Sequence, residues 1–194
     1  YDVQGGYNLY YHPSIGSDGT IYVGKSGYFY AINPDGTVKW NDSLAQWIVP
    51  DSPPVVGPDG SVYAVAQSGR YGYNRLYAWN ADGELKWYRY LTDNIDPEVS
   101  PVLGDDGVLY VLTEYGYIHA YNSEDGSSLW TYQLEDVRFI KGHPTLKDGV
   151  LYFGTSDKNA LFAINVSSQD LAESPWPKYQ GDLKNQGQQF DEHY

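Results

Sequence analysis

Residues 12–40 read HPSIGSDGTIYVGKSGYFYAINPDGTVKW, and this stretch decides the fold because the chain repeats its pattern three more times. Every copy has a proline near its start, followed by an Asp-Gly turn, a tyrosine in an apolar run and an Ala-x-Asn triplet. A tryptophan follows at a similar spacing in each copy: Trp40, Trp87, Trp130 and Trp176. The same residue types in the same order four times indicate a repeat architecture.

Each copy is predicted to form four short antiparallel strands. In the first copy, the runs Thr20–Gly24 and Tyr28–Asn33 are rich in the aromatic and β-branched residues that favour strands. The Asp-Gly pairs beside such runs supply the positive φ that a tight hairpin turn requires. A four-stranded meander of about 40–45 residues is the size of one propeller blade. We therefore expect an all-β chain, a β-propeller built of four-stranded antiparallel blades, with negligible helix.

Composition and charge narrow the classes of function. The 194 residues carry 12 Lys and Arg against 25 Asp and Glu, which gives a net charge of -13. Nucleic acids and anionic membranes bind basic surfaces, so neither is expected as a partner. The absence of cysteine excludes disulfides, thiolate zinc sites and cysteine nucleophiles. No apolar run approaches the ~20 residues that a membrane-spanning helix needs, so membrane insertion is not expected.

The order Pro, Asp-Gly-x-x-Tyr-Val-Gly, Ala-Ile-Asn and Asp-Gly-x-x-x-Trp resembles the PQQ-type, quinoprotein-like β-propeller repeat, over roughly residues 12–180. That family includes the quinoprotein dehydrogenases. It also includes non-enzymatic propellers such as the outer-membrane barrel-assembly scaffold lipoprotein, and the present chain resembles this branch more. The resemblance implies the fold and leaves the function open, because one fold hosts many functions.

The repeats occupy most of the chain, and four repeats are fewer than the resemblance implies for a closed ring. Three alternatives follow: the chain is part of a longer polypeptide, it forms a small four-bladed ring, or it is half of a ring that a homodimer completes. Within 174–187 the pattern Trp-Pro-x-Tyr-x-x-Asp resembles the segment near the ring-closing point of such propellers. We expect blades over 1–187, a polar tail over 188–194, and repeats near 12–40, 53–87, 100–130 and 143–176.

Catalytic chemistry is not predicted. The quinoprotein resemblance would imply an aspartate base, a metal held by acidic and amide side chains, and commonly a cysteine pair. The chain has no cysteine, and no position matches those ligands, so neither PQQ nor calcium is expected as a cofactor. No metal site is predicted; if one existed, His12 and His143 would be its first ligands, because both precede a proline at the start of a first strand. Such strands line the central channel of a propeller.

The second repeat has the feature most typical of a binding site, a longer Tyr-rich loop that contains arginine. Loops of this composition are good adhesive surfaces for protein or glycan. The candidate partner-binding residues are Trp47, Arg70, Tyr71, Tyr73 and Arg75. The recurrent tryptophans are interpreted as structural contacts between blades.

These observations together predict a non-catalytic interaction or scaffold propeller, placed outside the cell, on its surface or in the periplasm. Two alternatives stay open: a glycan-binding, lectin-like propeller, and a fragment of a PQQ-dependent dehydrogenase-like protein.

Overall fold

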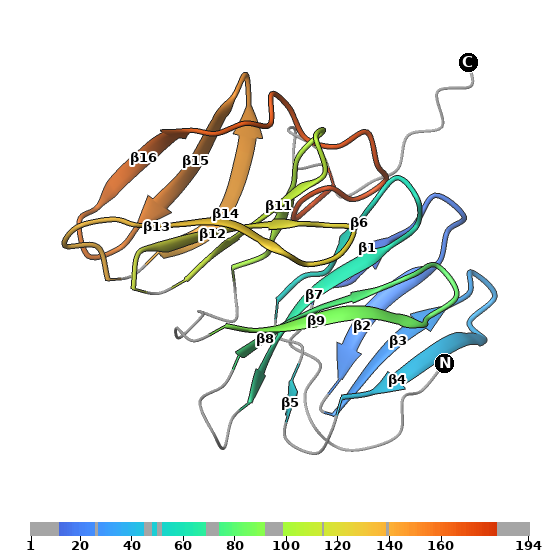
Figure 1. The fold of residues 1–194 in the computed structure, drawn as a ribbon. Helices are drawn as coiled ribbons and strands as arrows, with labels where there is room; N and C mark the ends of the chain where they lie inside the picture. Colours follow the sequence, from blue (N-terminus) through green and yellow to red (C-terminus); the bar gives the residue numbers. More distant parts are fainter. Residues whose placement is uncertain are drawn as a thin grey trace.

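The computed structural model describes residues 12–181 except 26, 45–47, 50–51, 69–73, 92–98, 114 and 139. The described residues form antiparallel strands joined by turns, with no helix, so the all-β prediction is confirmed. A helix with the length and hydrophobicity to cross a membrane is therefore also absent from this part of the chain. The sheets are arranged side by side as the blades of a propeller (Figure 1).

Four sheets follow one another along the chain. Blade 1 contains β1 (Ser14–Ile15), β2 (Ile21–Lys25), β3 (Tyr28–Ile32) and β4 (Val38–Ser43). Blade 2 contains β5 (Ile48–Val49), β6 (Val55–Val56), β7 (Val62–Ser68), β8 (Asn74–Trp79) and β9 (Leu85–Leu91). Blade 3 contains β10 (Val102–Leu103), β11 (Val108–Leu112), β12 (Tyr117–Asn122) and β13 (Ser128–Gln133). Blade 4 contains β14 (Ile140–Lys147), β15 (Val150–Thr155) and β16 (Ala160–Asn165).

The Asp-Gly turns have the geometry that their sequence predicts. Gly19 has a φ of 78°, and the carboxylate of Asp18 accepts a hydrogen bond from the backbone N–H of Thr20 at 3.0 Å. The second blade repeats the arrangement, with Asp59 accepting from the N–H of Ser61 at 2.9 Å. The side chain thus holds the turn closed while glycine supplies the left-handed conformation.

Each blade has two apolar faces, because alternate side chains of a strand point to opposite sides. On the trailing face, which contacts the following blade, lie Tyr22, Tyr63 and Tyr110. On the leading face, which contacts the preceding blade, lie residues such as Val62. Three apolar clusters fill the junctions, one between each pair of adjacent blades. The core of this molecule therefore lies between the blades.

Two of the recurrent tryptophans join neighbouring blades. The indole N–H of Trp40 donates to the carbonyl of Ala81 in blade 2, and that of Trp87 donates to the carbonyl of Ser123 in blade 3, each at 3.1 Å. A Cβ placed on Gly126 would lie 2.5 Å from the ring of Trp87. The turn that meets each tryptophan thus needs glycine because the indole packs directly on the backbone.

The fourth repeat departs from the prediction. Blade 4 has three described strands, and Trp176 lies beyond β16 instead of on a fourth strand. Pro175 and Pro177 flank this tryptophan, and proline lacks the N–H that an internal ladder position needs. Trp176 instead forms an antiparallel bridge with Val56 of blade 2. We call residues 169–181 the strap; Figure 1 shows it in red, leaving blade 4 and crossing blade 3 toward blade 2.

Candidate functional site

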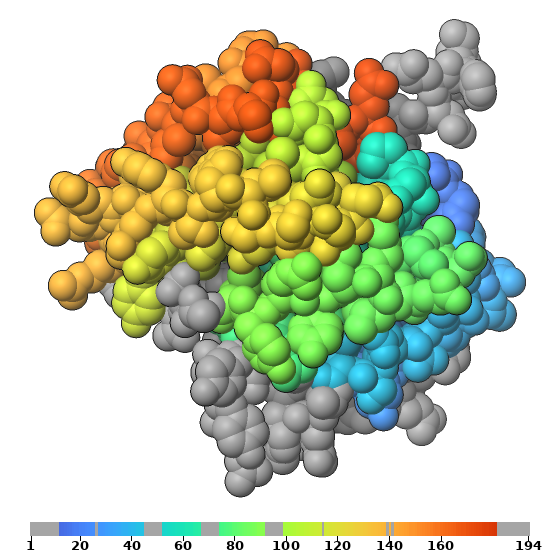
Figure 2. Space-filling model, viewed as in Figure 1, coloured from blue at the N-terminus to red at the C-terminus, as the bar shows by residue number. Residues whose placement is uncertain are grey.

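One cluster of aromatic and cationic side chains lies on the leading face of blade 2. The register of β8 and β9 places Arg75 opposite Tyr90 and Tyr77 opposite Tyr88. All four side chains therefore share one face of the blade, at the end away from the Asp59 turn. We call these four residues the Arg75–tyrosine surface. The outer strand β9 is drawn in green on the side of the molecule toward the viewer in Figure 2.

The guanidinium of Arg75 organises the surface. It donates to the phenol oxygen of Tyr77 at 3.1 Å and to that of Tyr90 at 3.3 Å. Its central carbon lies 4.8 Å from the ring centroid of Tyr90 and 5.8 Å from that of Tyr88, within cation–π range. Burial is the largest single effect and works against the charged form of Arg75, but the hydrogen bond to Tyr77 together with electrostatic interactions with the surrounding tyrosines outweighs it and raises the pKa of the guanidinium. The arginine is therefore a positive charge held in place by the surrounding tyrosine side chains.

The surface has a buried base and an open rim. Tyr77 is buried, whereas Tyr88 and Tyr90 are 42% and 54% exposed. Tyr77 stacks on Trp79 with ring centroids 5.3 Å apart, and Trp79 stacks in turn on Phe29 of blade 1 at 4.6 Å. The exposed rings are thus supported by a rigid aromatic ladder. Rigid tyrosines and an ordered arginine are the residue types that dominate binding energy at protein interfaces.

The contacts place one of the predicted binding residues, and its role in binding stays a prediction. Arg75 is at the centre of the surface. Trp47, Arg70, Tyr71 and Tyr73 lie outside the described residues. Sequence reasoning missed Tyr77, Tyr88 and Tyr90, which belong to regular strands; the signal that could have found them is the pairing of β8 with β9.

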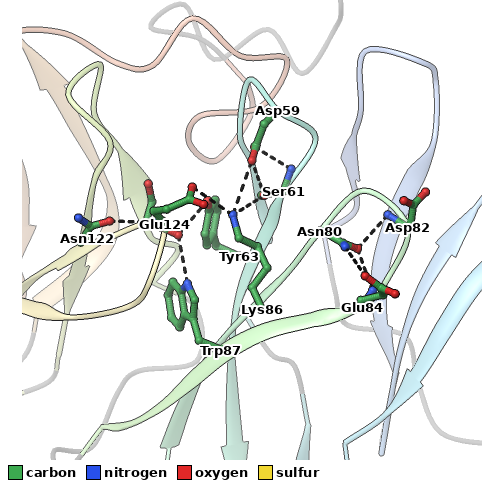
Figure 3. A network of polar contacts seen from close by, with 11 residues as sticks. Asp59, Ser61, Tyr63, Asn80, Asp82, Glu84, Lys86, Trp87, Asn122 and Glu124 are labelled. Atoms are coloured by element: carbon green, nitrogen blue, oxygen red, sulfur yellow. Dashed lines mark hydrogen bonds and ion pairs between the residues drawn. The ribbon is translucent and has the colours of Figure 1, made fainter.

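A second candidate is a cleft of about 590 Å³ where the turns of blades 2 and 3 meet. Its lining combines apolar groups with acidic ones: Pro58, Asp59, Tyr63, Leu103, Gly104, Asp105, Gly107, Ser123, Glu124, Ala172 and Glu173. Lys86 approaches two of the carboxylates, with its ammonium 3.7 Å from Asp59 and 3.4 Å from Glu124 (Figure 3). Burial opposes ionisation of Asp59, but hydrogen bonds from Ser61 and the charge of Lys86 leave its pKa lowered. This network joins the two blades with charges that are already paired.

The two histidines of the metal hypothesis come together around one tyrosine of the strap. The ring of Tyr179 lies 3.6 Å from that of His143, in a stacked arrangement, and 5.1 Å from that of His12, edge to face. Burial, together with the charges of His12 and Lys178, lowers the pKa of His143 to about 4.

Acidic and histidine side chains are not gathered into a candidate metal centre within the described residues. Within residues 12–181, apart from the gaps given above, no three His, Asp or Glu side chains are grouped so that they could hold a metal ion. The aromatic ring of Tyr179 packs against both histidines.

Four stacked antiparallel sheets and tryptophans that dock on the next blade define a β-propeller of the PQQ-repeat type. The family model described as outer membrane protein assembly factor BamB matches residues 9–104 and 74–186. The chain therefore belongs to this BamB family. No curated protein matches the sequence.

Solved structures share the fold at low sequence identity. The crystal structure of BamB from Moraxella catarrhalis superposes with a TM-score of 0.62 at 20% identity, covering 83% of this chain and 51% of that one. A protein of unknown function from Bacteroides caccae gives 0.61 at 15%, covering 90% and 62%. Quinohemoprotein alcohol dehydrogenase from Comamonas testosteroni gives 0.59 at 15%, covering 81% and 34%. The chain thus spans about half the length of the BamB structure, and these similarities show the fold alone.

Proposed function

We propose that this chain is a non-catalytic propeller module that binds a protein partner through the Arg75–tyrosine surface. The observation that carries the proposal is the pair of exposed rings, Tyr88 and Tyr90, fixed in place by one guanidinium. Because the rings are already ordered, a partner that covers them loses little side-chain entropy on binding. Arginine and tyrosine are also enriched at the centres of interfaces.

Family membership supports a scaffold role and a place in the bacterial envelope or outside the cell. The family is named for a factor in outer membrane protein assembly. The chain lacks the cysteine pair common in quinone-dependent dehydrogenases, and its described His, Asp and Glu side chains form no group that could hold a metal ion. The module therefore works by contact, as a periplasmic, cell-surface or secreted domain.

A site-specific photo-crosslinker tests the partner surface. A benzoylphenylalanine at Tyr88 is expected to crosslink a defined protein in the source organism, and Arg75→Ala in the same chain should abolish the product. The matched control carries the crosslinker at Leu129, which is similarly exposed on the outer strand of blade 3. Equal products at both positions, or none at Tyr88, would contradict the proposal.

The exposed rings also favour a second function, glycan binding, because a sugar can lie against an aromatic face. A glycan array probed with the wild-type chain and with Tyr90→Ala separates glycan binding from protein binding. Specific glycan signals that disappear in Tyr90→Ala would replace the protein-binding proposal. Recovery of a bound quinone chromophore after incubation with PQQ and calcium would instead support the dehydrogenase alternative.

The outward faces of blades 1 and 4 carry apolar residues, and we attribute these faces to contact with further blades. Those blades come from a longer polypeptide or from a second copy of this chain. Light scattering distinguishes the sources, because a homodimer has twice the chain mass of 21.8 kDa.

A further inference from the structure

The strap, residues 169–181, is bonded to three blades through its backbone. The carbonyl of Asp170 accepts from the N–H of Asp105 at 2.9 Å, and Ala172 donates to the carbonyl of Leu103 at 3.0 Å. Further along, the carbonyl of Trp176 accepts from the N–H of Val56 at 2.8 Å. Two more backbone hydrogen bonds complete the set. The N–H of Leu103 donates to the carbonyl of Pro177 at 2.9 Å, and the N–H of Gly149 donates to the carbonyl of Gln169 at 2.8 Å. The strap therefore lies along the short inner strands β10 and β6 after leaving blade 4.

Its apolar side chains reach every junction between the blades. Leu171 packs on the cluster between blades 3 and 4, and Ala172 belongs to the cluster between blades 2 and 3. Trp176 is buried in the cluster between blades 1 and 2. At its far end, Tyr179 contacts His12 from the start of blade 1 and His143 from blade 4.

We propose that the strap is a latch, which closes the inner edges of β6 and β10 and opens as one unit without unfolding the blades. The strap is an irregular segment with a Pro-Trp-Pro sequence, so it lacks a continuous ladder of its own. Segments of this kind open at lower free energy than the strands of a core sheet.

Opening changes what the inner strands offer to a partner. The N–H groups of Val56 and Leu103 and the carbonyl of Leu103, all now bonded to the strap, become free. Free backbone groups at a strand edge pair with an extended peptide. The site that the latch closes would thus bind an extended peptide that carries an anchoring aromatic residue. The strap itself is such a peptide, with Trp176 as the anchor.

Amide hydrogen exchange of the full chain tests the latch. In Trp176→Ala, the amides of Val56, Leu103 and Ala172 are expected to exchange at least tenfold faster, while the amides of the β7–β8 ladder change less than twofold. The matched control, Tyr132→Ala, removes an exposed ring from the outer strand β13 and should change none of these. Unchanged exchange at Val56 and Leu103, or equal acceleration throughout all blades, would overturn the proposal.

Two further measurements keep the test decisive. If Trp176→Ala fails to fold, Tyr179→Ala replaces it in the test, because that variant removes only the ring contact at the far end of the strap. Tyr179→Ala should raise the exchange rates of the same amides. A synthetic peptide of residues 169–181 added to the Trp176→Ala chain should restore slow exchange at Val56 and Leu103. A peptide that carries the same tryptophan substitution should not, and equal protection by both peptides would contradict the aromatic anchor.

Discussion

The inner and end blades share one repeat but differ in what that repeat buries. Leu161 of blade 4 stands two residues before the alanine of the Ala-x-Asn triplet, and it is 76% exposed. The side chains at the same position of the other three blades are completely buried: Phe29, Leu76 and Ile118. The difference lies in the neighbour, because each of those three blades is followed by another blade. Burial in a propeller is thus a property of the junction, as in other repeat proteins whose units contact only their neighbours.

Blade 1 shows the same effect on its opposite face. Ile21 and Val23 point to the leading side and are only half-buried. The matching residues of blade 2, Val62 and Ala64, are fully buried against blade 1. The described stack therefore carries an open leading face at one end and an open trailing face at the other.

The largest expected effect comes from removing a tryptophan at an inner junction. Trp87 is buried against blade 3, so Trp87→Ala should destabilise the chain by about 3–5 kcal/mol. Denaturant unfolding followed by tyrosine fluorescence measures the change. Tyr132→Ala on the exposed side of β13 is the control and should stay within about 0.5 kcal/mol. Equal losses in the two variants would show that the junction carries no special stability.

The repeat position of Leu161 tests the comparison directly. Leu76→Ala should cost about 2–5 kcal/mol because it leaves a cavity in a closed junction. Leu161→Ala should cost less than about 0.5 kcal/mol, since its side chain is already in solvent. A large loss in Leu161→Ala, measured at concentrations where the chain is oligomeric, would instead show that another copy covers this face.

Substitutions at two glycines distinguish the stability cost of displacing a docked tryptophan from the cost of backbone strain. Both Gly126 and Gly142 have positive φ, 68° and 79°. A Cβ at Gly126 would meet the ring of Trp87 at 2.5 Å, whereas one at Gly142 has nothing within 4 Å. Gly142→Ala should therefore cost about 1–2 kcal/mol, the strain of the left-handed conformation. Gly126→Ala should cost about 1–3 kcal/mol more through overpacking, and equal midpoints for the two variants in urea would refute tryptophan docking.

The residues that predict the fold from sequence act locally. Asp-Gly turns, alternating strands and Ala-x-Asn triplets need only their own blade, so four blades could be inferred. The prediction for Trp176 was wrong, because this residue falls at the interval expected of a fourth strand while Pro175 and Pro177 prevent a strand there. The two flanking prolines were the physical sign of a different role.

The candidate site was less predictable because it depends on register. Arg75 stood out as an arginine beside a Tyr-rich loop, but Tyr88 and Tyr90 look like any residues of an outer strand. Which face they share with Arg75 depends on pairing across the hairpin, where the register shifts between Ala78 and Trp79. The exposure of a side chain could not be predicted from its repeat position either, since Leu161 and Leu76 have the same place in the repeat but differ in burial.

The smallest effect concerns pH and the contact that joins blades 1 and 4. The pKa of His143 falls from 6.5 to about 4 on folding, so between these values the unfolded chain binds more protons than the folded one. Stability from the neutral imidazole is therefore complete above pH 6.5 and is lost as the pH falls toward 4. The pKa of Asp18 is lowered to about 2, so the stability that its carboxylate contributes is lost only below this pH window.

The urea midpoint of the wild type should thus decrease from pH 7.5 to pH 5. In His143→Phe, which keeps a ring against Tyr179, the decrease should be smaller. His12 faces the same tyrosine, so an identical pH profile in His143→Phe would assign the effect elsewhere and remove His143 as the acid-sensitive point between the end blades.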